Sequence, residues 1–103
     1  MTILEQIILL CCGSKERLKA YIDQNTDLAT YCKEKYFYLF GLVIKISSSR
    51  PELIEEAKVI NHERILNLLK EHRPELYVVI TTYPKGLEWF NNQNFSNFIK
   101  LIP

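Results

Sequence analysis

The first apolar residues of the chain recur at the spacing of a helix. Ile3, Ile7 and Leu10 lie three or four positions apart, which places them on one face. Thr2 and Glu5 have the spacing of a capping box, in which a hydroxyl and a carboxylate each accept a backbone N–H at a helix start. The pattern therefore predicts a helix that begins at about residue 3.

A second short helix is predicted directly after the first. Gly13 suits a helix end because glycine adopts a left-handed backbone at little cost. Ser14 suits the N-cap of the next helix, which we expect to end near Asn25. Its apolar stripe consists of Leu18, Tyr21 and Ile22.

The segment 27–47 has the same period over a longer distance. Its polar residues fall on one line of a helix, and its apolar residues occupy the opposite face. The polar line is Asp27, Thr30, Glu34, Gly41 and Lys45. This spacing predicts a long central helix. Phe37 does not fit the pattern, and a strand over 37–46 is the alternative.

Two prolines divide the second half of the chain into short elements. Three serines at 47–49 break the pattern shortly before Pro51, which suits the first turn of a helix that ends near Val59. Asn61 suits the cap of the next helix, and Pro74 begins another. The β-branched residues of 77–82 favour a strand, so a strand near 76–82 is the alternative to that last helix.

The final quarter of the chain is predicted to contain a turn and two short helices. Tyr83-Pro84-Lys85-Gly86 has the composition of a turn. Residues 87–91 have a helical pattern, and Asn94 suits the cap of a last helix over Phe95, Phe98, Ile99 and Ile102.

Taken together, these elements predict an all-α fold, a compact bundle of five to seven helices of which several are short. A length of 103 residues is that of a single globular domain, 1–103. The alternative is an α+β fold with strands near 37–46 and 76–82.

Charge and cysteine content narrow the class of protein. Thirteen basic and twelve acidic residues give a net charge of +1, which lacks the strongly basic character of most nucleic-acid-binding domains. No apolar stretch approaches the length of a membrane span, so we predict no membrane contact. Three cysteines, two of them adjacent, predict reduced and buried thiols in a cytoplasmic protein.

Candidate chemistry is sparse. His62 and His72 are ten positions apart, about 80° out of alignment on one helix at 100° per residue. They are predicted to be surface residues at helix ends. The three cysteines lack the spacing of a zinc site. The three glycines are isolated, so no phosphate-binding loop is present. We therefore predict no enzyme, no catalytic residue, no metal and no cofactor.

Partner binding is the remaining hypothesis. Glu52, Glu55 and Glu56 would share one side of a helix and could meet a partner protein with a basic surface. Tyr83 and Trp89 lie near the predicted turn and are residue types that often anchor interfaces. We expect a small cytoplasmic protein–protein interaction domain. The narrower hypothesis is an immunity or inhibitor protein that masks a partner such as a toxin.

Two alternative functions remain open. The basic N-terminal third could bind nucleic acid, because cations interleaved with aromatic rings can hold phosphates and stack bases. The residues concerned are Lys15, Arg17, Lys19, Lys33 and Lys35, with Tyr21, Tyr31 and Tyr36 among them. The nearby acidic residues make nucleic acid the less favoured partner. A homodimer through the aromatic central segment is the other alternative.

Overall fold

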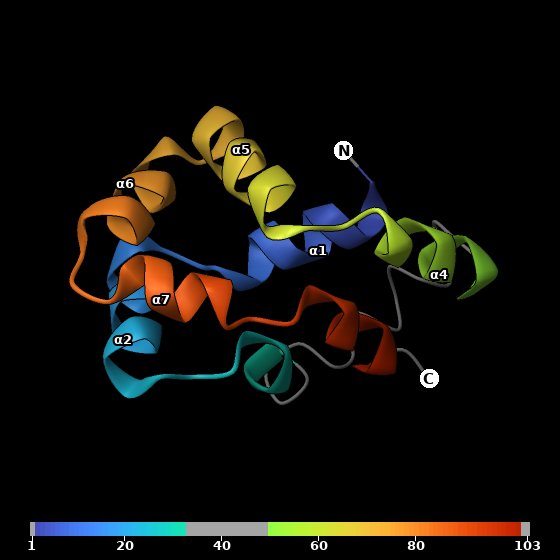
Figure 1. Ribbon diagram of the computed structural model, residues 1–103, viewed down its shortest axis with the longest axis horizontal. Coiled ribbons are helices and arrows are strands. Elements are labelled where there is room, and N and C mark those ends of the chain that lie inside the picture. The colour runs from blue at the N-terminus through green and yellow to red at the C-terminus, as the bar shows by residue number, and fades with distance from the viewer. Residues whose placement is uncertain (1, 33–49, 102–103) are drawn as a thin grey trace.

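Helices are the only regular elements in the residues that the computed structural model describes, which are 2–32 and 50–101 (Figure 1). In chain order they are α1 (Ile3–Cys11), α2 (Lys15–Gln24), α4 (Arg50–Lys58), α5 (His62–His72), α6 (Pro74–Thr82), α7 (Gly86–Asn91) and the 3₁₀-helix η1 (Phe95–Leu101). Residues 28–32 are helical as well. The prediction of an all-α fold with several short helices is confirmed.

The predicted helix caps are present. The Thr2 hydroxyl accepts the Glu5 N–H at 3.2 Å, and the Glu5 carboxylate accepts the Thr2 N–H at 2.8 Å. Ser14 and Asn61 each accept a backbone N–H at the starts of α2 and α5. Gly13 has a φ of 70°, the left-handed conformation that lets the chain turn between α1 and α2. These short polar contacts explain where the helices begin.

The alternative strand over 76–82 is wrong, because this segment is α6. Leu76, Val79 and Ile80 are buried on one helical face. The spacing i, i+3, i+4 lets all three pack into the core, which a strand of period two would not allow. Pro74 occupies the first turn of α6, as its missing N–H permits. Packing here overrides the strand preference of the β-branched residues.

The predicted central helix is described only at its start. Residues 28–32 are helical, in agreement with that prediction. Residues 33–47, which include the alternative strand at 37–46, lie outside the described residues. The last predicted helix is a 3₁₀-helix rather than an α-helix.

The core is assembled around α1, which crosses the middle of the molecule (Figure 1). This helix packs against α4, α5 and η1, while α6 packs against α2, α5 and α7. The largest fully buried hydrophobic side chains come from α1, α2, the helical residues 28–32, α5, α6, α7 and η1. They are Leu4, Ile8, Leu18, Leu28, Ile65, Leu69, Leu76, Ile80, Phe90 and Phe98. Within the described ranges, no helix has the length and apolar character needed to cross a membrane.

The prediction for the cysteines is half right. All three are buried, as expected. Cys11 and Cys32, however, form a disulfide, with their Cα atoms 6.0 Å apart, and only Cys12 is a thiol. The fold brings the end of α1 against the helical residues 28–32, which the sequence spacing did not reveal. Because disulfides are uncommon in the reducing cytoplasm, this bond removes the cysteine-based support for a cytoplasmic location.

Candidate functional site

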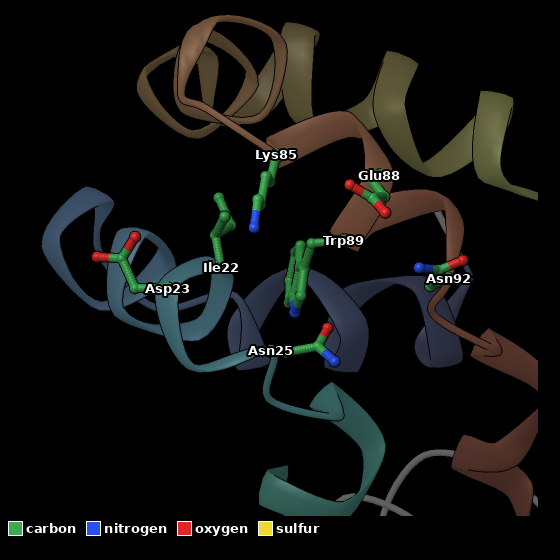
Figure 2. Close-up of a pocket in the computed structure, with 7 residues that line it drawn as sticks. All are labelled: Ile22, Asp23, Asn25, Lys85, Glu88, Trp89 and Asn92. Atoms are coloured by element: carbon green, nitrogen blue, oxygen red, sulfur yellow. The ribbon is translucent and has the colours of Figure 1, made fainter.

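A small cavity opens where the C-terminal end of α2 faces α7 (Figure 2). Its volume is about 260 Å³. It is lined by Ile22, Asp23, Asn25, Lys85, Glu88, Trp89 and Asn92. Pockets for drug-sized ligands are usually larger, roughly 300–1,000 Å³. This α2–α7 pocket therefore has the size for one side chain or a short chain segment.

The first wall of the pocket is the end of α2. Asn25 has a left-handed backbone, with φ 50° and ψ 45°. Its N–H donates to the Ile22 carbonyl at 3.2 Å, and the Thr26 N–H donates to the Tyr21 carbonyl at 2.9 Å. This pair of bonds is the Schellman motif, which ends a helix and fixes the direction of the following chain. Asparagine tolerates the left-handed conformation better than most residues do.

The opposite wall is the turn before α7. Lys85 is the second residue with a left-handed backbone, with a φ of 66°, and the Gly86 N–H donates to the Tyr83 carbonyl at 2.9 Å. With Pro84 at its second position this is a type II turn, whose third position favours glycine. A Cβ on Gly86 would lie 2.4 Å from the Ile80 carbonyl oxygen. The turn is thus held against α6 and keeps a lysine in a strained conformation.

Trp89 forms the floor of the pocket. Only 3% of its surface is exposed, and its ring stacks on Tyr21 with the centroids 6.3 Å apart. The indole Nε1–H donates to the Thr26 carbonyl at 2.8 Å. Trp89 therefore closes the end of the core and shapes the pocket from below. It does not protrude as an anchor would.

Tyr83 lies beside the pocket and is joined to its rim. Its hydroxyl donates to the Asp23 carboxylate, with the oxygens at 3.0 and 2.9 Å. This hydrogen bond to Asp23, with some burial, raises the pKa of the Tyr83 phenol because the carboxylate favours the protonated form. The contact fastens α2 to the end of α6 and orients the Asp23 carboxylate.

Four polar side chains at the rim make no hydrogen bond or ion pair with any residue in 2–32 or 50–101. They are Asn25, Lys85, Glu88 and Asn92. Figure 2 shows the Lys85 ammonium reaching toward the Trp89 ring and the two asparagine amides on the lower and right-hand side of the opening. The pocket thus offers donors, acceptors and both signs of charge over an apolar floor.

The predicted acidic face lies elsewhere in the molecule. Glu56 accepts the Leu4 N–H at 3.0 Å and so helps to cap α1. Glu55 is exposed and pairs with Lys58 at 2.8 Å, and Glu52 is exposed. Because α4 packs against α1 and η1, whereas α7 packs against α2 and α6, these glutamates do not share a surface with Trp89 (Figure 1).

The two histidines do lie at opposite ends of α5, as predicted. His72 is exposed, whereas His62 is half-buried and its Nε2 lies 2.6 Å from the Gln93 carbonyl oxygen. The His62 ring packs edge-on against Phe90, with the centroids 5.6 Å apart. In the part of the chain that the structure describes, no cluster of three His, Cys, Asp or Glu could hold a metal.

Two aromatic residues of the basic N-terminal third, Tyr21 and Tyr31, contact other residues of the protein. Tyr21 is buried and its ring contacts that of Tyr31, with the centroids 4.9 Å apart. The Arg17 guanidinium donates to the Tyr31 hydroxyl. Burial of Tyr21 removes it as a stacking platform for a base. Lys33, Lys35 and Tyr36, which belong to the same prediction, lie outside the described residues.

Sequence reasoning missed most of the residues that form the pocket. Asp23, Asn25, Lys85, Glu88 and Asn92 are ordinary surface residue types, and helix ends bring them together. Asn25 after a helical stripe and Lys85 after a proline were the available signals of left-handed turns. Comparison with protein-family models, curated proteins and solved structures found no match.

Proposed function

We propose that this chain is a small protein–protein interaction domain that contacts its partner through the α2–α7 pocket. The observation that carries the proposal is the group of four rim side chains without a partner in the described residues. These side chains surround an apolar floor, and two of them belong to the residues with a left-handed backbone, Asn25 and Lys85. Lys85 is held in a strained left-handed conformation, and strained residues of this kind are often found at functional sites.

The chemistry of the rim supports a polypeptide ligand. An asparagine amide both donates and accepts, so Asn25 and Asn92 match the N–H and C=O groups of a bound chain segment. Lys85 and Glu88 can each pair with an opposite charge. The floor of Ile22 and Trp89 can receive an apolar or aromatic group at the centre of the contact.

The test is capture of the partner by the tagged domain in a lysate of its source cells, followed by mass spectrometry. The variant is Lys85→Glu with Glu88→Lys, which exchanges the rim charges without changing net charge. Its matched control, Lys70→Glu with Glu71→Lys, makes the same exchange on the exposed side of α5. We expect one stoichiometric protein that the control retains and the rim variant loses.

Retention of that protein by the rim variant would remove the α2–α7 pocket from the proposal. A high ratio of absorbance at 260 to 280 nm in the eluate, lost in strong salt, would favour the nucleic-acid alternative. The narrower role of an inhibitor or immunity protein predicts that the domain lowers the activity of the captured protein. If the partner instead binds α4 through a basic surface, the double variant Glu52→Lys with Glu55→Lys should abolish its capture.

A further inference from the structure

A second, more apolar hollow lies on the other side of Tyr83, between α2 and α6. Its volume is about 390 Å³. Lys15 and Lys19 lie one helical turn apart on the α2 wall, and Val78 and Thr82 have the same spacing on the α6 wall. Pro84 and Tyr83 close the end nearer the α2–α7 pocket. We call this hollow the α2–α6 groove.

The α6 wall of the groove presents apolar surface to water. Val78 is 53% exposed, although its neighbours Val79 and Ile80 are buried. Pro84 is exposed at the end of the groove. Removing such apolar surface from water is the main driving force of association between proteins. The groove therefore has one wall that favours apolar side chains of a ligand.

The α2 wall of the groove is positively charged. The Lys19 ammonium lies over the Tyr83 ring, 5.8 Å from its centroid. Glu75, the carboxylate at the other end of the groove, is paired with Arg73 at 2.8 Å. Asp23, one turn beyond Lys19, is bound by the Tyr83 hydroxyl. The carboxylates of Glu75 and Asp23 thus have partners, whereas Lys15 and Lys19 line the groove and form no ion pair with another described residue.

We propose that the α2–α6 groove docks an acidic, partly apolar segment of the partner protein. Lys15 and Lys19 favour carboxylates of the ligand through charge complementarity. Val78 and Pro84 favour apolar side chains of the same ligand segment. The proposal rests on the proposed interaction function and adds the chemistry of the partner. It reverses the expectation of a basic partner, which came from the glutamates of α4 at the other end of the molecule.

The test is a selection of random linear peptides displayed on phage against the immobilised full-length domain. The enriched peptides are then synthesised with a fluorescent label and their affinities measured by fluorescence polarisation. We expect enrichment of Asp and Glu together with large apolar residues. Lys15→Glu with Lys19→Glu should weaken binding at least tenfold, since opposite charges become like charges. Val78→Ser should weaken it several-fold.

The matched control is Lys58→Glu with Lys70→Glu, which changes net charge equally on α4 and α5 and should leave the affinity within twofold. A glutamate at position 15 begins α2, where negative charge favours the helix, so the groove variant should fold. Enrichment of basic or neutral peptides, no enrichment, or equal binding by the Lys15/Lys19 variant would each overturn the groove proposal. None of these results bears on partner loss by the Lys85/Glu88 variant, which tests the interaction function separately.

Discussion

Carboxylates have opposite roles at the two ends of the molecule. Around α1, α4 and α5, Glu5 is completely buried and is bonded to Thr2 and Arg64, and Glu56 accepts the Leu4 N–H. Around α2 and α7, Glu88 stands at the rim of a pocket without a partner in the described residues. Glutamate side chains thus stabilise the fold at one end of the molecule, whereas a glutamate at the other end is available to a ligand.

The difference follows from burial. A buried carboxylate must be hydrogen-bonded, because an unpaired charge away from water is very costly. Glu5 meets this requirement with two elements at once, the start of α1 and Arg64 on α5. An exposed carboxylate such as Glu88 is satisfied by water and can exchange that water for a partner. Burial therefore separates structural glutamates from available ones more clearly than their sequence positions do.

Removing the buried carboxylate should have the largest effect. Glu5→Ala should lower the free energy of unfolding by about 3 kcal/mol, because it deletes the capping box and the bonds to Arg64. Glu88→Ala, the matched truncation at the pocket rim, should change it by less than about 0.5 kcal/mol. Urea denaturation followed by circular dichroism measures both. Equal effects of the two variants would contradict the comparison.

Low pH should destabilise the end of the molecule that contains Glu5. Burial alone raises the pKa of Glu5, but hydrogen bonds from Arg64 and Thr2 outweigh it and hold the pKa below its ordinary value of 4.5. The Glu5 carboxylate therefore contributes its full stabilisation of the fold above pH 4.5. This contribution is lost as the pH falls through the lowered pKa of Glu5. Thermal melts between pH 7 and pH 3 should show this loss. The variant Glu5→Gln should show a weaker dependence on pH below 4.5.

The glutamates of α4 test the comparison within a single helix. Glu56→Ala removes a cap of α1 and should cost about 1 kcal/mol of unfolding free energy. Glu55→Ala breaks only an exposed pair with Lys58 and should cost less than about 0.5 kcal/mol. Chemical denaturation of the two variants side by side gives the difference. A larger loss from Glu55→Ala would show that the cap contributes little.

The smallest effect is expected at the pocket itself. Lys85→Gly relieves the left-handed backbone and should raise the free energy of unfolding by about 0.5 kcal/mol, since the freedom of glycine in the unfolded chain offsets part of the gain. Lys85→Ala keeps the strain and should not stabilise the domain. Differential scanning calorimetry can compare the two. If glycine and alanine behave alike, the turn stores no strain.

Much of the fold could be predicted from the sequence, because local signals and the core agree. Thr2, Ser14 and Asn61 have short side chains that cap helices, and each cap is present. Pro74 predicted the start of α6, although the β-branched residues after it favoured a strand. That ambiguity was resolved by tertiary packing of Leu76, Val79 and Ile80, which a local pattern describes only in part.

The candidate site was less predictable, because it depends on contacts between distant residues. Trp89 was predicted to belong to a partner-binding site and it lines the α2–α7 pocket, but its hydrogen bond to Thr26 crosses 63 positions of sequence. The Tyr83 contact with Asp23 crosses 60 positions. The pairing of Cys11 with Cys32 also depends on the fold, which is why the count of three cysteines was misleading.

The Cys11–Cys32 disulfide makes a closed covalent ring of the chain between residues 11 and 32. All of α2 lies inside this ring, and α2 supplies one wall of both the pocket and the groove. A protease that cuts once inside the ring therefore releases no fragment. The nicked molecule gains the mass of one water and separates into two pieces only after reduction.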